Sequence, residues 1–229
     1  MTSEIKALPI EVIHLMAAGE VIDSLAAVVR ELAENALDAG ATRISIGLWL
    51  DQWRVRVADN GRSMAIADLH QAALPHSTSK IQDRNDLWRI SSLGFRGEAL
   101  HSLAQLSDLE ICSRPSHEDE GWHVAYNHQG APIAVRTVAI APGTIVTATQ
   151  IFGNWLPRRQ SLPTPAQQLR AIQLTMQHLA LCHPHVTWQV EQSDRPWFSL
   201  WSSPSPQQIL PQILREVESV DLRESNSTD

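Results

Sequence analysis

Several features that assign proteins to specialised classes are missing or scarce in this sequence. Only two cysteines occur, Cys112 and Cys182, and neither has the spacing to histidines that a zinc site requires. Cys182 is followed directly by His183, but that adjacency alone does not indicate a metal site, and a buried structural thiol is the better interpretation. We therefore expect no zinc in this protein.

Long apolar runs are also absent. No stretch is long enough to span a membrane, and the N-terminus lacks the basic-then-apolar pattern of a signal peptide. We therefore expect a cytoplasmic protein without a membrane partner. Basic residues are outnumbered, and the net charge of −7 argues against a strong, uniform affinity for nucleic acid, although a local basic patch is compatible with it. The 229 residues suffice for one substantial domain, with or without a fragment of another.

The segment from Ser24 to Gly40, SLAAVVRELAENALDAG, carries the clearest periodic pattern in the chain. On a helix, its apolar residues fall on one side and its polar residues on the other. Asp23 or Ser24 can cap the start, and Gly40 stands where helices usually end. Glu31 and Asn35 are four residues apart and share the polar face. This pair could activate a water and hold a metal ion, but a solvated helix face explains the same pattern.

A hairpin is predicted after this helix, because apolar residues alternate over 44–50 and again over 55–57. Its second strand runs into Asp59-Asn60-Gly61. An ionised carboxylate only accepts hydrogen bonds, so Asp59 could accept one from the exocyclic amine of a nucleotide base. An ordinary turn residue is the alternative interpretation.

A long polar segment, 74–96, follows a predicted helix over 65–73. Such a segment inside a compact domain is typical of a functional lid or of disorder. Within it, Thr78, Ser79 and Lys80 offer two hydroxyls and an ammonium group to phosphate oxygens, or form an ordinary loop or helix start.

A second phosphate-binding candidate lies at 94–100, where two glycines precede a predicted helix. Glycines let the backbone approach a phosphate closely, and a helix N-terminus offers free N–H groups. The segment lacks both the Lys-Ser/Thr pair of a P-loop and the spacing of a Rossmann turn. It therefore indicates a different kind of phosphate cradle.

The remaining patterns complete the expected fold. Strands are predicted at about 108–113, 122–127, 132–139, 144–149, 186–190 and 197–201. Helices are predicted from Ile10 to Met16, ended by a turn at 17–19, at 166–182, and at 205–218, where Pro211 would kink the helix. Residues 152–165 are predicted to form a loop, and 219–229 a disordered tail. This order of elements predicts an α+β fold with helices layered on one face of a sheet.

Five stretches, taken in order, strongly resemble the motifs of the MutL family of DNA mismatch-repair ATPases: ELAENALDAGATRI, DNGRSM, HSTSKI, SLGFRGEAL and Gly143-Thr144. That family belongs to the superfamily that also contains gyrase, a heat-shock chaperone and histidine kinases, the GHKL group. MAAGEVI and FGNWLPRR resemble MutL more than its cousins. Each motif is weak alone, but five in register over roughly residues 4 to 160 are specific. The resemblance implies a two-layer α/β sandwich of the GHKL type, with helices on one face of a mixed, largely antiparallel sheet.

The resemblance also implies a role for residues in each motif. Glu31 matches the general base that deprotonates the attacking water, and Asn35 matches the Mg²⁺ ligand. Asp59 matches the carboxylate that reads adenine, and Thr144 matches the threonine near the base. The other implied contacts to ATP are Ala39, Met64, Thr78, Ser79, Lys80, Leu93, Gly94, Phe95, Arg96, Gly97, Glu98 and Leu100. The implied chemistry is in-line phosphoryl transfer to water.

The implied partners follow from the same resemblance. They are ATP with Mg²⁺, a second copy of the chain once ATP is bound, MutS-type mismatch-repair proteins and, weakly, DNA. ATP would order the lid and the N-terminal segment, and hydrolysis would release them.

Three departures from the family pattern affect these expectations. Ser63 replaces a second glycine of the adenine motif, which would cost about 1 kcal/mol if its φ were positive. The family's Pro-Ala-Arg-Arg reads Leu-Pro-Arg-Arg at 156–159. The sequence ends at Asp229, before the second-domain lysine that reaches the γ-phosphate in the family. We therefore expect slow hydrolysis, with the ATP-binding domain over 1–200 and the start of a second domain over 201–229. A non-hydrolysing nucleotide-binding or protein-interaction module remains the alternative.

Overall fold

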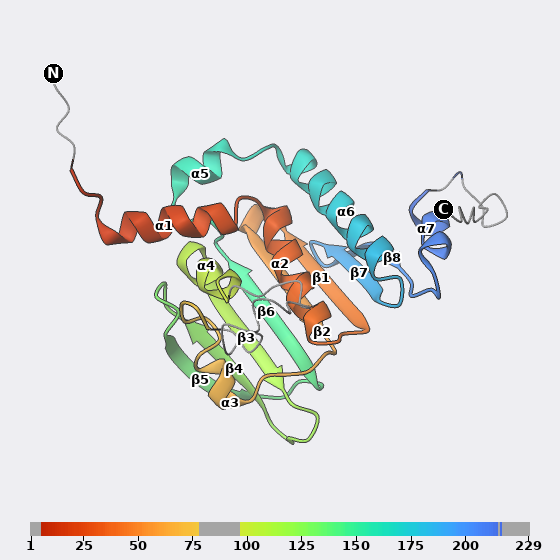
Figure 1. Ribbon diagram of the computed structural model, residues 1–229, viewed down its shortest axis with the longest axis horizontal. Helices are drawn as coiled ribbons and strands as arrows, with labels where there is room; N and C mark the ends of the chain where they lie inside the picture. The colour runs from red at the N-terminus through yellow and green to blue at the C-terminus, as the bar shows by residue number, and fades with distance from the viewer. Residues whose placement is uncertain (1–5, 78–96, 215, 217–229) are drawn as a thin grey trace, which may run out of the picture.

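One eight-stranded sheet runs through the molecule, and helices cover one of its faces (Figure 1). The computed structural model describes residues 6–77, 97–214 and 216. The strands are β1 (Arg43–Trp49), β2 (Arg54–Asp59), β3 (Asp108–Arg114), β4 (Gly121–Tyr126), β5 (Pro132–Val138), β6 (Gly143–Thr149), β7 (Thr187–Gln192) and β8 (Arg195–Leu200). The helices are α1 (Ile10–Val21), α2 (Leu25–Asp38), α3 (Ile66–Leu69), α4 (Ala99–Leu106), α5 (Leu156–Ser161), α6 (Pro165–Cys182) and α7 (Leu210–Ile213), with short 3₁₀ turns η1 (Leu50–Gln52) and η3 (Pro206–Gln208).

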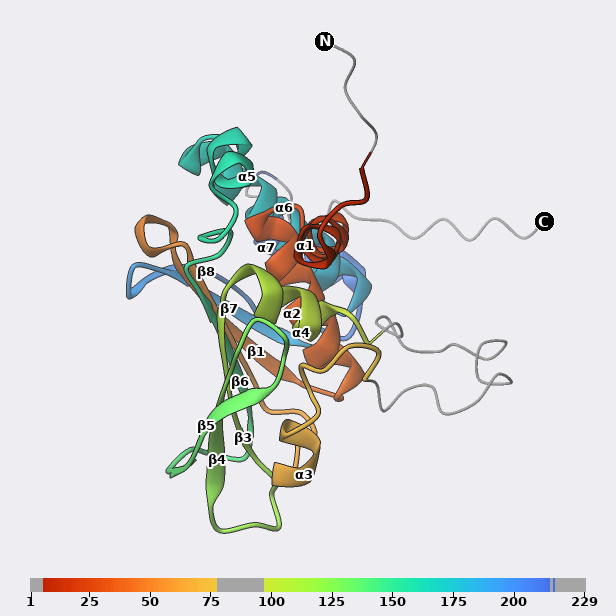
Figure 2. The ribbon, with the colours of Figure 1, turned by 90° about the vertical axis from the view of Figure 1, so that its left-hand side faces the viewer.

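The strand order is β5-β4-β3-β6-β2-β1-β7-β8. Neighbouring strands pair antiparallel, except that β1 and β7 pair in parallel. Helices α1, α2, α4 and α6 lie on the same side of this sheet (Figure 2). The predicted two-layer fold with a mixed, largely antiparallel sheet is therefore confirmed.

Helix α2 forms for the reasons its sequence indicates. Ser24 caps it, because the serine Oγ accepts the Ala27 N–H at 3.1 Å. The helix ends at Ala39, and Gly40 follows with a φ of +75°, which suits glycine. Its apolar stripe packs against the sheet and is buried: Leu25, Ala27, Val28, Val29, Leu32, Ala33 and Ala36. Burying each larger member contributes about 1.5–3 kcal/mol, so the polar face is held in a fixed orientation.

Helix α1 is longer than predicted. The expected turn at 17–19 is wrong, because the helix continues through these residues to Val21. Ala18 is buried, and a Cβ on Gly19 would lie 2.4 Å from the ring of Trp155. The small residues therefore admit a tryptophan from a distant part of the chain instead of ending the helix.

Three other local predictions need correction. The loop predicted over 152–165 contains α5, with Pro157 in its first turn, where the N–H that proline lacks has no helical partner. The long kinked helix predicted over 205–218 is wrong within the described residues. The chain instead forms η3 and the single-turn α7, and Leu214 is extended. The helix predicted over 65–73 shrinks to α3, which is followed by turns.

The cysteines and the C-terminal segment complete the description. Cys182 is exposed and Cys112 is half-buried, so the interpretation of Cys182 as a buried thiol is wrong. Ile209, which follows η3, is fully buried in the same core as the sheet residues. The domain boundary near residue 200 stays a prediction.

Within the described ranges, no single helix is both long and apolar enough to cross a membrane, and α1 with α2 reaches that composition only as a pair bent by 75°.

Candidate functional site

The polar face of α2 carries the predicted catalytic pair. Glu31 is one-fifth exposed, and its Oε1 lies 3.1 Å from Arg30 Nη2. Arg30 also has its Nε 3.9 Å from Glu34 Oε1, so it lies between two carboxylates. Asn35 lies one turn beyond Glu31, and its backbone carbonyl accepts the Ala39 N–H at 3.0 Å. Glu31 and Asn35 thus share a face of a rigid, well-packed helix, as predicted.

Asp59 lies at the end of β2, where the structure places it in a largely buried position. Its Oδ1 accepts the N–H of Gly61 at 2.8 Å. Burial raises the pKa of the Asp59 carboxyl from 3.8 to about 6, against the opposing effect of the Gly61 hydrogen bond. The carboxyl is therefore a desolvated acceptor whose second oxygen accepts no hydrogen bond from the described residues.

The turn after Asp59 docks on the end of α2. The Arg62 N–H donates to the Ala39 carbonyl at 2.8 Å, and an Arg62 guanidinium nitrogen lies 3.3 Å from the Asp38 carbonyl. A Cβ on Gly61 would lie 2.9 Å from Ala39 O, so glycine permits the close approach. Ser63 does not have a positive φ, so the strain considered for this substitution does not arise.

A row of polar side chains crosses three neighbouring strands beside this turn. Asp59 on β2 pairs with Thr144 on β6, which pairs with Ser113 on β3. Ser113 Oγ and Thr144 Oγ1 are 3.0 Å apart, and the Met64 N–H donates to Ser113 Oγ at 2.9 Å. Asp59, Met64 and Thr144, predicted from separate motifs, are thus brought together. A Cβ on Gly143 would lie 2.1 Å from Asp59 O, so glycine is required there.

Ser113 is the residue that sequence reasoning missed. It is fully buried, and it occupies an alternating position shared with Leu109 and Ile111 on β3. A polar residue at an apolar position of a strand was the available signal, because a buried hydroxyl needs hydrogen-bond partners.

The predicted phosphate-binding segment is described only at its C-terminal end. Gly97 has a φ of +65°, and Glu98 stands at the start of α4, where its carbonyl accepts the Ser102 N–H at 2.8 Å. Glu98 Oε1 lies 3.7 Å from His76 Nδ1. Leu100 is partly buried against the core. Seven predicted contacts lie outside the described residues: Thr78, Ser79, Lys80, Leu93, Gly94, Phe95 and Arg96.

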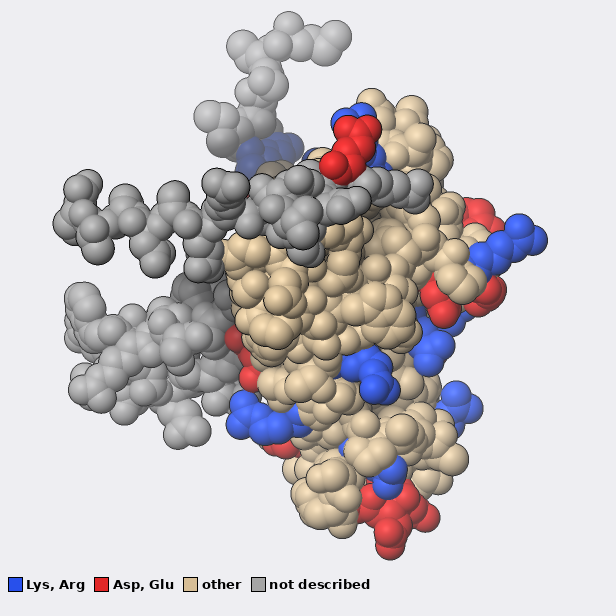
Figure 3. Space-filling model, turned by 90° about the vertical axis from the view of Figure 1, so that its right-hand side faces the viewer, with Lys and Arg blue, Asp and Glu red and all other residues tan. Residues whose placement is uncertain are grey.

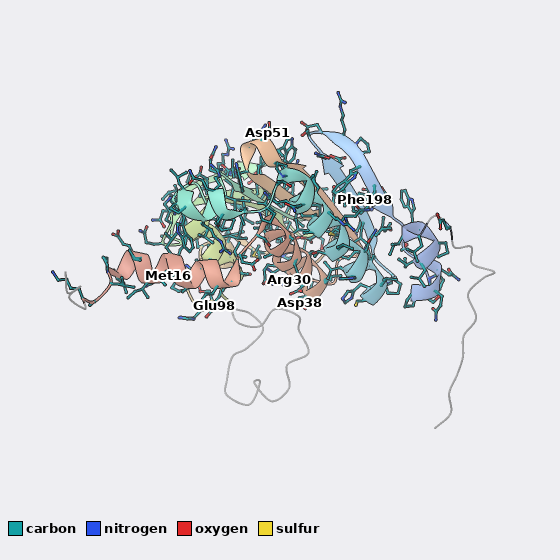
Figure 4. The ribbon with its side chains drawn as sticks, turned by 90° about the horizontal axis from the view of Figure 1, so that it is seen from above. Met16, Arg30, Asp38, Asp51, Glu98 and Phe198 are labelled. Carbon is teal, nitrogen blue, oxygen red and sulfur yellow. The ribbon has the colours of Figure 1, made fainter. Side chains whose placement is uncertain are left out.

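Charged residues of α2 and of the start of α4 lie on the same side of the molecule. Figure 4 shows Glu98 of the α4 start on the same side of the molecule as Arg30 and Asp38 of α2, while Asp51 lies on the opposite side. Among the described residues, no group of three or more His, Cys, Asp and Glu side chains could hold a metal ion. A cation at Asn35 would therefore take most of its ligands from phosphates and water.

The distribution of charge on the surface bears on the expected weak binding of DNA. Figure 3 shows the side that carries α6 and β8, where lysine and arginine occur in small separate groups between acidic residues. The described residues of this face form no continuous basic stripe of the kind that nucleic-acid binding favours.

Three comparisons with known proteins give a consistent result. Residues 23–142 match the family model described as "Histidine kinase-, DNA gyrase B-, and HSP90-like ATPase". The chain is 59% identical over 224 residues to the DNA mismatch repair protein MutL of Nostoc punctiforme, which covers 98% of this chain and 39% of that protein. It is 42% identical over 181 residues to MutL of Xylella fastidiosa, which covers 79% of this chain and 29% of that protein. The chain thus spans about two-fifths, or less, of these relatives.

Solved structures share the fold. The Aquifex aeolicus MutL ATPase domain complexed with ADP aligns with a TM-score of 0.67 and 26% identity over 85% of this chain and 70% of that one. The N-terminal domain of a DNA repair protein aligns with a TM-score of 0.75 and 24% identity, over 91% of this chain and 62% of that one.

Proposed function

Because the chain belongs to the family of histidine kinase-, DNA gyrase B- and HSP90-like ATPases, we propose that it binds and hydrolyses ATP as the ATPase region of a MutL-type DNA mismatch-repair protein. The observation that carries this proposal is the row formed by Asp59, Thr144 and Ser113, joined to the end of α2 through Ala39. The row brings Asp59, the proposed base-reading carboxylate, close to the end of the helix that carries Glu31 and Asn35. The ADP complex of the Aquifex aeolicus domain supports a nucleotide as ligand.

Base recognition follows from Asp59. Its ionised carboxylate accepts the exocyclic amine of adenine, and burial strengthens that hydrogen bond because water does not compete. Desolvation also keeps the pKa of Asp59 near 6, so the empty site holds a carboxylate that is poorly compensated at neutral pH. An amine donor relieves part of this cost when the nucleotide binds.

Hydrolysis is assigned to α2. Glu31 accepts a proton from the attacking water, and to do so its carboxylate must turn from Arg30 toward the nucleotide. That exposed ion pair costs little to break, about 0–1 kcal/mol. Asn35 would hold Mg²⁺, which would supply charge neutralisation to the phosphates. Gly97 and the N–H groups at the start of α4 are the described part of the proposed phosphate-binding site.

The partner we propose for α1 is a second copy of the chain. The exposed apolar side chains of α1 and of the residues just before it are Leu8, Ile10, Val12, Ile13 and Met16, with relative exposures of 39–62%. Such a patch marks an interaction surface when it is contiguous. Helix α1 packs along α4, whose N-cap Glu98 lies in the predicted phosphate-binding segment (Figure 2). Nucleotide binding can thus influence the dimerising helix. MutS-type proteins and, weakly, DNA are further proposed partners of the complete protein.

Single-turnover hydrolysis tests the catalytic assignment. The chain is mixed in excess over radiolabelled ATP with Mg²⁺, as wild type and as Glu31→Ala. We expect slow product formation by the wild type and roughly 10²–10⁴-fold less by Glu31→Ala, with ATP binding retained. Equal rates in the two proteins would contradict the role of Glu31.

The Arg30–Glu31 contact favours a second candidate function, a nucleotide-binding module that does not hydrolyse ATP. In this case Glu31 stays with Arg30 after the nucleotide binds. ATP binding without product formation in either protein would select this alternative.

A further inference from the structure

Ser113 is a fully buried hydroxyl at one end of the proposed base-binding row. It lies opposite Thr144, which lies opposite Asp59, so the three residues occupy adjacent positions on β3, β6 and β2. Directly paired residues of neighbouring strands point to the same face of a sheet. Ser113 is therefore within the site but separated from Asp59 by Thr144.

The hydrogen bonds of Ser113 leave few choices for its proton. A serine hydroxyl has one proton and two acceptor positions. The Met64 N–H occupies one acceptor position at 2.9 Å. Thr144 Oγ1 lies at 3.0 Å, whereas the other acceptor, the carbonyl of Gly143, lies at 3.4 Å. Either hydroxyl can donate across the 3.0 Å contact, but a 3.4 Å bond from Ser113 to Gly143 would be weak, so donation from Ser113 to Thr144 is the stronger arrangement.

We propose that Ser113 is a positioning residue that turns the hydroxyl of Thr144 into a donor toward the nucleotide base and thereby favours adenine over guanine. Once Thr144 Oγ1 accepts the hydrogen bond from Ser113, its own proton is available to the nucleotide base. The site then presents an acceptor, Asp59, beside a donor, Thr144. The same serine fixes the backbone of Met64, which holds the next turn in place.

The edge of adenine matches this arrangement. Its exocyclic amine donates toward Asp59, and its ring nitrogen N1 accepts from Thr144, directly or through one ordered water. Guanine has a carbonyl and an N1–H at these positions, so it would set an acceptor against a carboxylate. This inference rests on the proposed nucleotide-binding function.

The test compares the affinities of two nucleotides that are not hydrolysed. ADP and GDP are titrated with Mg²⁺ into wild type, Ser113→Ala and a control, Ser107→Ala. Ser107 is also a buried serine, but it donates to the Leu103 carbonyl before the other end of β3. In Ser113→Ala we expect the Kd for ADP to rise about tenfold and the Kd for GDP to change by less than about twofold. Ser107→Ala should leave the ratio of the two Kd values unchanged.

A second ligand separates positioning from a loss of structure. In 1-deaza-ADP, carbon replaces the ring nitrogen that Thr144 would reach. The wild type should bind it about tenfold more weakly than ADP, and Ser113→Ala should bind the two ligands equally. If Ser113→Ala does not fold, Ser113→Cys keeps the side-chain size with a weaker donor and is measured in the same way.

The outcomes distinguish this inference from the proposed function. Equal weakening of ADP and GDP in Ser113→Ala, or no change in either, overturns the role of Ser113 while the nucleotide site stands. Wild-type protein that binds neither nucleotide overturns the proposed function and the inference with it.

Discussion

Replacing Asp59 by asparagine should stabilise the empty protein. Asparagine keeps an oxygen that can accept the Gly61 N–H, but it carries no charge to desolvate. The folded-state pKa of Asp59 is raised from 3.8 to about 6. The contribution of the Asp59 carboxyl to the free energy of unfolding is therefore fully present below pH 3.8 and is lost as pH rises through about 6. The difference corresponds to about 3 kcal/mol at pH 7.5 and roughly half of that at pH 5.

Denaturant unfolding without nucleotide measures this effect. Asp59→Asn should raise the unfolding free energy relative to wild type, up to about 3 kcal/mol at pH 7.5 and clearly less at pH 5. The control, Asp51→Asn, changes an exposed aspartate on the opposite side of the molecule and should change stability by less than about 0.5 kcal/mol (Figure 4). A less stable Asp59→Asn protein, or a gain independent of pH, would refute the picture of a desolvated, uncompensated carboxylate.

Three further predictions follow from the same geometry. ATP affinity should fall as pH is lowered through about 6, because protonation removes the negative charge with which the Asp59 oxygen not bound to Gly61 accepts from adenine, and calorimetric titration from pH 5 to 8 would show a flat profile if Asp59 were not involved. Asn35→Ala should weaken nucleotide binding in Mg²⁺ but not in EDTA, whereas the same loss in both would show that Asn35 does not act through the metal. Gly19→Ala should destabilise the protein by about 1–3 kcal/mol despite alanine's better helix propensity, because its Cβ would meet Trp155, and thermal unfolding at unchanged stability would contradict this packing.

Local features of the fold could be predicted from the sequence. The cap at Ser24 and the apolar stripe of α2 depend only on neighbouring residues, and alternation alone marked β1 and β2. The continuation of α1 could not be predicted, because it depends on Trp155 filling the space beside Gly19. The prediction of a helix over 205–218 was wrong because it rested on local helix propensity. In the structure, the prolines of this segment stand at the starts of the short elements η3 and α7.

In the candidate site, too, local motifs could be predicted from the sequence, whereas features that depend on long-range contacts could not. Motifs identified Asp59, Met64 and Thr144 separately, and the structure brings them together. Ser113 could not be assigned, because its role depends on β6 lying between β2 and β3 in the sheet. That order is set by long-range pairing, which local alternation does not encode.

The central claim is that Asp59 reads the base of a bound adenine nucleotide. Calorimetric titration of ADP with Mg²⁺ into wild type, Asp59→Ala and Asp51→Ala tests it most directly. We predict that wild type and Asp51→Ala bind alike and that Asp59→Ala loses about 1–3 kcal/mol of binding free energy, the contribution of a hydrogen bond to a charged group. Unchanged ADP affinity in Asp59→Ala, with the protein folded, would contradict the account.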